Sequence, residues 1–270
     1  MSIGGSSQPR PTRNERRDAA REKARILREE QKKRDRRKRL LIQGGVIVAV
    51  IAVAALIVGI VLQNSQPAGP PGPRNMASDG IVLSGVDGTI TATETKALQP
   101  DDDPPIPTVQ DDSGDVANIV MYVDYLCPPF CGQFERTNGE NIRTLVESGA
   151  ATLEVHPIAI LVNKSAGTQY SLRAANAAAC VADRSPDAFF DFNAILFRED
   201  VQPAEGSTGL TDDELKSLAE EAGATNLSQV ESCIASKQFK SWVQASTARA
   251  LGGPIPNADI PNVQALRPCS

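Results

Sequence analysis

The sequence predicts an α/β domain that follows a membrane-spanning segment, on three observations. An uncharged run of 23 residues, Leu40 to Leu62, is long enough to cross a bilayer as a helix. Beyond it, two β-branched apolar runs, 116–125 and 151–161, flank a segment with helical periodicity. Strand, helix and strand in this order are typical of a parallel βαβ unit, and about ninety residues of mainly helical pattern follow.

Charge is distributed unevenly along the chain. Residues 1–39 hold 15 basic and 6 acidic side chains, a net charge of +9, whereas the net charge of the whole chain is −5. A basic N-terminal arm and an acidic remainder indicate that the two parts of the chain lie in different surroundings. The arm contains no aromatic residue that could stack on bases, so we interpret it as a topology signal that contacts anionic lipid, and we expect no nucleic-acid partner.

The apolar run, residues 40–62, contains no proline, and Gln43 is its only polar side chain. It is longer than the apolar core of a secretory signal, and it is too uniform for a buried core helix. Because the basic residues lie wholly on its N-terminal side, the arm is expected to be cytoplasmic and residues 63–270 extracytoplasmic. The sequence therefore predicts a single-pass protein of the cell membrane, with a linker at 63–80 that is rich in Pro, Gly and Ser.

The exported part begins with a predicted hairpin, because two short β-branched runs surround Asp87 and Gly88. The strand at 116–125 is nearly continuous in apolar residues, which predicts burial on both faces. The helix after it has Phe134, Ile142 and Leu145 as apolar anchors and Gly149 as a stop signal.

Helices are predicted for most of the chain beyond residue 165. Two capping boxes mark helix starts, Thr211 with Glu214 and Ser228 with Glu231. The segments with helical pattern are "TQYSLRAANAAACVAD", "PDAFFDFNAILF" and "KQFKSWVQASTARAL", the last ended by Gly252 and Gly253.

All five cysteines lie beyond the apolar run, on the side where disulfides persist; they are Cys127, Cys131, Cys180, Cys233 and Cys269. Five is an odd number, so two pairs leave one cysteine over.

Cys127 and Cys131 sit between the first apolar strand and its helix, in "DYLCPPFCGQFE". The free N–H groups and positive dipole of a helix N-terminus stabilise a thiolate, and a thiol of lowered pKa is also a better leaving group. The pair is therefore predicted to be redox-active, in preference to a local disulfide without turnover. A zinc site is disfavoured because four ligands with metal spacing are absent from the sequence.

The segment "MYVDYLCPPFCGQFE" resembles the active-site segment of the DsbA-like branch of the thioredoxin superfamily, with one residue inserted between the cysteines. The resemblance covers residues 115–250 and is strongest to membrane-anchored actinobacterial members. It implies a thioredoxin-like fold over 81–270, with a helical insertion at about 165–236. The matching positions are Asp124, Tyr125, Cys127, Pro128, Cys131, Phe134 and Glu135.

The resemblance also implies function. Cys127 would be the exposed nucleophilic thiol of a thiol–disulfide oxidoreductase, Cys131 the resolving thiol, and Cys180 with Cys233 a structural disulfide. Exported cysteine-containing proteins would be the substrates, and a membrane redox partner would re-oxidise the pair. No metal and no organic cofactor are expected. Whether the protein oxidises, isomerises or reduces its substrates is left open.

One alternative function is a copper carrier. The Sco-type relatives of the same superfamily combine Cys-x-x-x-Cys with a later histidine, and His156 is the single histidine here. In the Sco type that histidine comes much later in the chain. A hydrogen-bonded histidine on a strand is therefore the preferred interpretation.

Two departures from the family pattern matter. The first is the second proline, Pro129, which removes a backbone donor near Cys127 and leaves the Phe130 N–H as its predicted hydrogen-bond donor. Alternatively, because a residue before proline avoids the α region, the helix starts at Pro129 and Cys127 lies further out. Either arrangement predicts a weaker lowering of the Cys127 pKa than in a Cys-Pro-x-Cys relative, with a pKa above about 5.

The second departure is the C-terminal end, where a thioredoxin-like fold needs two more strands and a helix. Pro261 could open one such strand, but no second apolar run follows. We hypothesise a frameshift, because codons for Pro-Thr-Val-Leu-Val read one base later give the terminal "RPCS", which also explains Cys269. The C-terminal strands of the fold would then be missing, and a truncated, non-catalytic thioredoxin-like domain is the second alternative function.

Overall fold

The computed structural model describes residues 71–99, 105–111 and 113–265. The chain divides into two compact units, Met1–Pro67 and Ala68–Ser270, and the described residues belong to the second. The predicted arm, the predicted membrane helix, residues 63–70 of the linker and Cys269 lie outside them. Within the described ranges, no helix has both the length and the apolar composition that a bilayer crossing requires.

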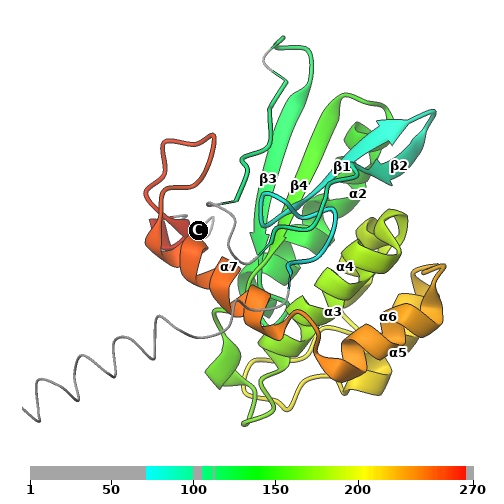
Figure 1. The fold of residues 1–270 in the computed structure, drawn as a ribbon, viewed down its shortest axis with the longest axis vertical. Coiled ribbons are helices and arrows are strands. Elements are labelled where there is room, and N and C mark those ends of the chain that lie inside the picture. Colours follow the sequence, from blue (N-terminus) through cyan, green and yellow to red (C-terminus); the bar gives the residue numbers. More distant parts are fainter. Residues whose placement is uncertain (1–70, 100–104, 112, 266–270) are drawn as a thin grey trace, which may run out of the picture. The chain divides into compact units, whose positions relative to one another are not determined.

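A mixed four-stranded sheet is the centre of this unit, with strand order β2-β1-β4-β3 (Figure 1). β1 (Ile81–Val86) pairs antiparallel with both β2 (Thr89–Ala92) and β4 (Ala151–Pro157). The predicted hairpin is confirmed: Asp87 and Gly88, which join β1 to β2, have φ angles of 51° and 78°. A two-residue turn of this kind needs positive φ at both central positions, which Asp and Gly tolerate.

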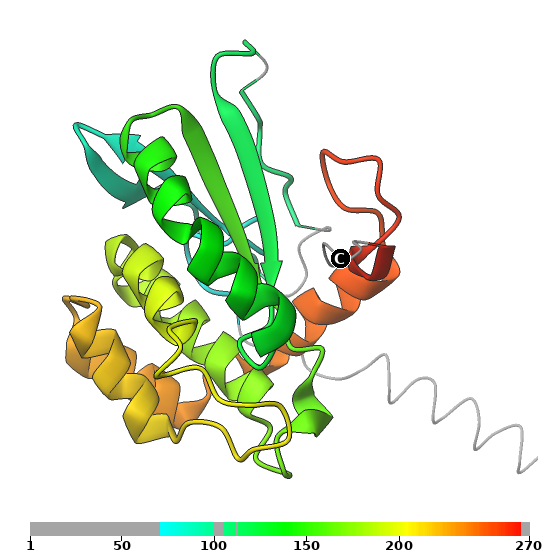
Figure 2. The ribbon, with the colours of Figure 1, turned by 180° about the vertical axis from the view of Figure 1, so that it is seen from behind.

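The predicted βαβ unit is also confirmed. β3 (Ala117–Val123) runs parallel to β4, in register from Ala117 opposite Ala151 to Val123 opposite Pro157. The connecting helix α2 (Gln133–Glu147) crosses one face of the sheet (Figure 2).

The burial pattern of β3 and α2 differs in part from the prediction. Ile142 anchors α2 as expected, but Phe134 and Leu145 are 41% and 43% exposed. In β3 only Met121 and Val123 are buried, because within the described residues β3 is the edge strand of the sheet.

The helical segments form a layer beside the sheet (Figures 1 and 2). α3 is rich in alanine and is buried along almost its whole length, which is expected of a helix that is apolar on most sides. Short turns, η2 (Val162–Lys164), η3 (Pro186–Ala188) and η4 (Val263–Ala265), complete the structure. The helices are α3 (Tyr170–Arg184), α4 (Phe189–Leu196), α5 (Asp212–Glu221), α6 (Leu227–Ser236) and α7 (Lys240–Gly252).

One of the two predicted capping boxes is present. Thr211 and Glu214 bond each other's backbone N–H groups at the start of α5. The box predicted at Ser228 is wrong, because α6 already begins at Leu227 after Asn226. The Asn226 side chain does not cap the helix and instead donates to the Arg184 carbonyl, 2.7 Å away.

The segment after α7 packs beside the sheet without joining it. Ile255 and Val263 form a small apolar cluster with Ile158, just beyond β4. Pro261 does not open a strand, and the described residues contain no cis peptide bond and no strand after β4.

The predicted bond between Cys180 and Cys233 is present, and it joins two buried positions on α3 and α6. We expect the double substitution Cys180→Ala/Cys233→Ala to lower the free energy of unfolding by about 2–4 kcal/mol, the usual effect of opening a loop of this size. Urea denaturation measures the change.

The same variant tests whether this disulfide has a redox role. Alkylation of Cys127 is expected to proceed at the wild-type rate in the folded double variant. A large loss of Cys127 reactivity, or an unchanged unfolding free energy, would contradict a purely structural bond.

Candidate redox site

The site is built on Asp124, the residue that follows β3. Its buried carboxylate accepts three hydrogen bonds: Oδ1 from the Leu126 N–H at 2.9 Å, and Oδ2 from the Leu161 N–H and the Ser171 hydroxyl, both at 2.8 Å. Its carbonyl accepts the Cys127 N–H at 3.1 Å. Asp124 therefore joins the cysteine turn to the loop after β4 and to the first turn of α3.

Burial raises the pKa of Asp124 above its ordinary value, although the bonds from Leu126, Leu161 and Ser171 oppose the shift. The cost of burying this carboxylate is thus offset only in part by its donors. The residue was matched in sequence by resemblance alone, and the structure gives it a physical role as a junction.

The inserted residue between the cysteines is accommodated as one π-helical turn, Pro128–Gly132. Its defining bond runs from the Gly132 N–H to the Cys127 carbonyl, 3.0 Å away. A π-turn contains one residue more than an α-turn, so regular α-helix resumes at Gln133. Cys127 is the N-cap, and the prolines occupy the first two positions, as in the first of the two predicted arrangements.

The two thiols have opposite electrostatic surroundings. The Cys131 side chain and the backbone N–H groups of Cys131 and Phe130 all favour the Cys127 thiolate, with the Cys131 side chain having the largest effect. Together they lower the pKa of Cys127 to about 6, against the effects of burial and of the Asp124 charge. The hydrogen bond to Cys127 and burial raise the pKa of Cys131 well above its ordinary value.

The donors near Cys127 differ in part from the prediction. The Phe130 N–H was expected to be the donor at Cys127, but the wide turn also presents the Cys131 N–H and thiol. A pKa of about 6 agrees with the expectation of a value above 5. These surroundings therefore favour the thiolate at Cys127 and the thiol at Cys131.

A buried polar chain lies beneath the cysteine turn. The Tyr125 hydroxyl donates to Asn193 Oδ1 at 3.1 Å, and Asn193 Nδ2 donates to Glu135 Oε1 at 2.8 Å. Burial raises the pKa of Glu135, although its bond from Asn193 opposes the shift. Asn193 was missed in the sequence; the signal that could have found it is a single neutral polar residue within the apolar helix "FFDFNAIL".

Apolar side chains are exposed near the cysteines. Phe130, between the two cysteines, is 52% exposed, and Phe134 on the first turn of α2 is 41% exposed. Ile160 is 47% exposed and lies next to Leu161, which is bonded to the same Asp124 as the cysteine turn. Phe134, predicted to be an apolar anchor of α2, belongs to this exposed rim.

His156 is not part of the cysteine site. Its Nε2 lies 3.0 Å from Glu154 Oε1, and its ring stacks on Tyr122 with a centroid separation of 4.3 Å. Across the part of the chain that the structure describes, no three His, Cys, Asp or Glu side chains are grouped closely enough to hold a metal ion. Cys127, Cys131 and His156 thus do not form the three-ligand set of the copper alternative.

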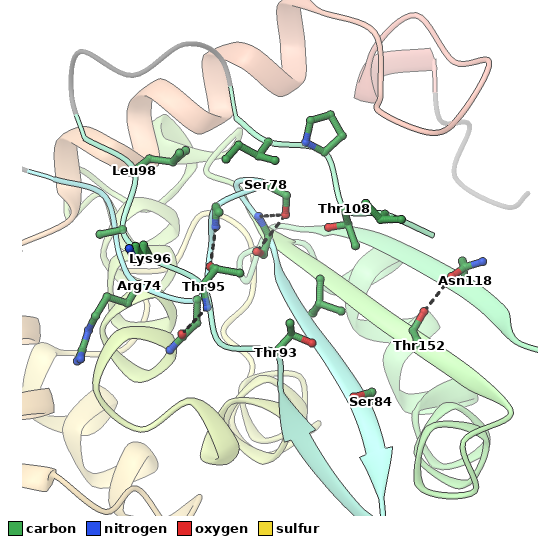
Figure 3. Close-up of a pocket in the computed structure, with 18 of the residues that line it drawn as sticks. Arg74, Ser78, Ser84, Thr93, Thr95, Lys96, Leu98, Thr108, Asn118 and Thr152 are labelled. Carbon is green, nitrogen blue, oxygen red and sulfur yellow. Dashed lines mark hydrogen bonds between the residues drawn. The ribbon is translucent and has the colours of Figure 1, made fainter. Parts of the chain in front are cut away.

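A hollow of about 940 Å³ lies on the face of the sheet opposite α2, away from the cysteines (Figure 3). Thr152 and Asn118 bond each other on its floor, and Ser78, Thr95 and Thr108 line its sides. Its lining combines aliphatic, hydroxyl, amide and charged side chains and contains neither cysteine of the site. The hollow is therefore separate from the redox site.

Comparison with known proteins agrees with this geometry. A family model described as "Thioredoxin" matches residues 116–252, about half of the chain and all of its βαβ unit and helical layer. The chain belongs to the thioredoxin superfamily.

Two solved structures from Mycobacterium tuberculosis are about one-third identical to this chain over the parts that align. Oxidised DsbA is 36% identical, over 60% of this chain and 73% of that one, with a TM-score of 0.46. Reduced DsbG, a disulfide bond oxidoreductase, is 34% identical, over 68% and 73%, with a TM-score of 0.49.

A curated relative, the serine/threonine-protein kinase PknE of the same species, is 35% identical over 108 residues. The match covers 39% of this chain but only 19% of the kinase. The chain thus matches about a fifth of the length of this curated relative.

Glu135 gives a test of the buried chain. Because its pKa is raised in the folded state, the folded protein binds the proton more tightly than the unfolded chain, and stability falls as pH rises through the folded pKa. Glu135→Gln removes this loss, so we expect it to stabilise the protein relative to wild type at pH 8, by on the order of 1 kcal/mol, and less toward pH 4.5.

Urea unfolding at several pH values measures the difference. Glu140→Gln, an exposed position of the same helix, is the control and is expected to show no such pH-dependent gain. A gain for Glu135→Gln that grows toward acid pH would refute the assignment.

Proposed function

We propose that this chain is an extracytoplasmic, membrane-anchored thiol–disulfide oxidoreductase that exchanges a Cys127–Cys131 disulfide with exported proteins. The observation that carries the proposal is the placement of the pair: Cys127 is the N-cap of the turn between β3 and α2, and Cys131 lies in that turn. The pair is asymmetric, because its surroundings lower the pKa of Cys127 and raise that of Cys131. Membership of the thioredoxin superfamily supports it, as does the resemblance of the cysteine segment to the DsbA-like branch. The uncharged run at 40–62 and the basic arm at 1–39 support the anchor and its orientation.

In the oxidised chain, a substrate thiolate would attack the Cys127 sulfur. The bond between Cys127 and Cys131 breaks, and Cys131 leaves with the electron pair and takes up a proton. A second substrate thiolate then attacks the substrate sulfur of the mixed disulfide, and Cys127 leaves as thiolate. The substrate loses two electrons and gains a disulfide, while the chain is reduced to the dithiol.

The same asymmetry favours this direction of transfer. Stabilising the thiolate of Cys127 stabilises the reduced form of the pair, which makes its disulfide a stronger oxidant. It also makes Cys127 the better leaving group in the second step. A membrane partner that accepts two electrons would then restore the disulfide. The apolar rim of Phe130, Phe134 and Ile160 suits an unfolded substrate, in which apolar side chains are still exposed.

A second candidate is a non-catalytic domain of the same fold. The observation that favours it is the position of β3, which within the described residues pairs on one side only although it leads directly to Cys127. An unpaired edge leaves the strand that supports the site less constrained.

Trapping separates the two candidates. Cys131→Ser removes the resolving thiol, so we expect Cys127 to remain in mixed disulfides with exported proteins, visible as high-mass species on non-reducing gels and lost on reduction. Cys127→Ser and the double variant are expected to give none.

A chain with the proposed activity should also speed disulfide formation in a reduced, unfolded substrate when it is supplied in the oxidised form. If Cys131→Ser traps no protein and the oxidised chain does not accelerate this reaction, the non-catalytic candidate is correct. Equal trapping by Cys127→Ser and Cys131→Ser would contradict the assigned roles of the two thiols.

A further inference from the structure

Arg136, in the first turn of α2, connects three separate segments around the cysteines. Its Nη1 donates to Gln202 Oε1 at 2.9 Å and to the Phe197 carbonyl at 3.1 Å. Its Nη2 donates to the Pro128 carbonyl at 3.4 Å, the longest of the three bonds. Phe197 is the C-cap of α4, directly after its last residue. A cation is favoured at this end of a helix by the free carbonyl groups and the helix dipole.

Gln202 lies directly against the cysteine turn. A Cβ atom at position 132 would be 1.9 Å from Gln202 Oε1 and 2.8 Å from Arg136 Nη1, so the glycine next to Cys131 leaves room for the ends of both side chains where they now lie. Gln202 Nε2 is buried and makes no hydrogen bond. The Gln202 side chain is placed by the bond that its Oε1 accepts from Arg136 and by its close approach to Gly132.

The turn between the cysteines needs such support more than an ordinary helix start does. Pro128 and Pro129 have no N–H to donate, and an isolated π-turn is intrinsically unfavourable. Inside the turn, the Cys127 carbonyl accepts the Gly132 N–H, and the Pro128 carbonyl accepts the Gln133 N–H. Arg136 adds a charged donor to the second of these carbonyls from outside the turn.

We propose that Arg136 is a positioning residue for the redox reaction: with Gln202 and Gly132 it forms a clasp that holds the wide cysteine turn in the shape in which Cys127 reacts. The clasp acts through Pro128 and Gly132, which directly follow Cys127 and Cys131, and it touches neither sulfur. Without it, the turn can relax toward α-helical geometry and rotate the Phe130 and Cys131 N–H groups away from the Cys127 sulfur.

The proposal rests on the proposed role of Cys127 as the reacting thiol, but its test needs no substrate protein. The readout is the rate at which iodoacetamide alkylates Cys127 as a function of pH, with the modified cysteine identified by peptide mass spectrometry. Failure of the clasp and failure of the proposed activity therefore remain separate results.

Four variants of the full chain define the test. Arg136→Met removes all three bonds, and Arg136→Lys keeps the charge but not the fork that bonds two segments at once. Gln202→Ala opens the clasp without changing any charge. Arg143→Met is the matched control, because Arg143 lies on the same helix but bonds Asp191 and covers the Phe190 ring, away from the cysteines.

We expect Arg136→Met and Gln202→Ala to move the alkylation profile to higher pH and to slow alkylation near pH 6 by about three- to tenfold. Arg136→Lys should be closer to Arg136→Met than to wild type, and the double variant Arg136→Met/Gln202→Ala no worse than the more affected single variant. Arg143→Met should retain the wild-type profile.

Two results would overturn the proposal. One is an Arg136→Met profile that coincides with that of Arg143→Met. The other is full rescue by Arg136→Lys together with a wild-type Gln202→Ala, which would show that the charge acts and the clasp does not. Circular dichroism checks that each variant is folded, and if Arg136→Met is not, Gln202→Ala alone decides.

Glycine substitutions give an independent check. Gly132→Ala places a methyl group where Gln202 lies, so it should reproduce the Gln202→Ala profile. Gly139→Ala on the same helix meets only the far end of the Glu135 side chain, at 3.3 Å, and should leave the profile unchanged. A wild-type profile for Gly132→Ala would contradict the clasp.

Discussion

The buried carboxylate of Asp124 is the constraint on which the site depends. β3 ends there, and the turn, the loop after β4 and α3 all reach it through the Leu126, Leu161 and Ser171 donors. A carboxylate with several fixed donors tolerates little displacement, because each lost bond leaves a buried polar group unpaired. Segments that are distant in sequence thus meet at Asp124. The Asp124 carbonyl also accepts the Cys127 N–H, and this bond fixes where the cysteine turn begins.

Because Asp124 fixes the start of the cysteine turn, the turn itself must accommodate the inserted residue before α2 begins and packs on the sheet. A shift of α2 by one residue would rotate Ile142 and Val146 off the core, since successive helical residues are about 100° apart. The π-turn confines the change to Pro128–Gly132 and leaves the packed face of α2 in place. It also adds the Cys131 N–H to the donors at Cys127, so the insertion compensates in part for the donors lost to proline.

Patterns that are local in sequence predicted the structure well. The Asp87–Gly88 hairpin, the βαβ unit and the Thr211 capping box follow from turn chemistry, periodicity and side-chain reach over a few residues. The partial burial of β3 and the contacts of Arg136 could not be found this way. They depend on which strand lies at the sheet edge and on a loop more than sixty residues away. The Cys180–Cys233 pairing came from resemblance, because spacing alone allows several pairings.

Two parts of the molecule therefore determine the reactivity of Cys127 separately. Asp124 fixes where the turn begins, and its own charge disfavours the thiolate. The turn and its clasp determine how many donors face the sulfur, and these favour the thiolate. Because the two effects oppose each other, the balance is sensitive to the shape of five residues, and a change at Gly132 or Gln202 can alter it without contact with either sulfur. A wider turn thus makes the reactivity of the redox pair adjustable from the C-terminal end of α4 and the loop after it, where the Phe197 carbonyl and Gln202 lie.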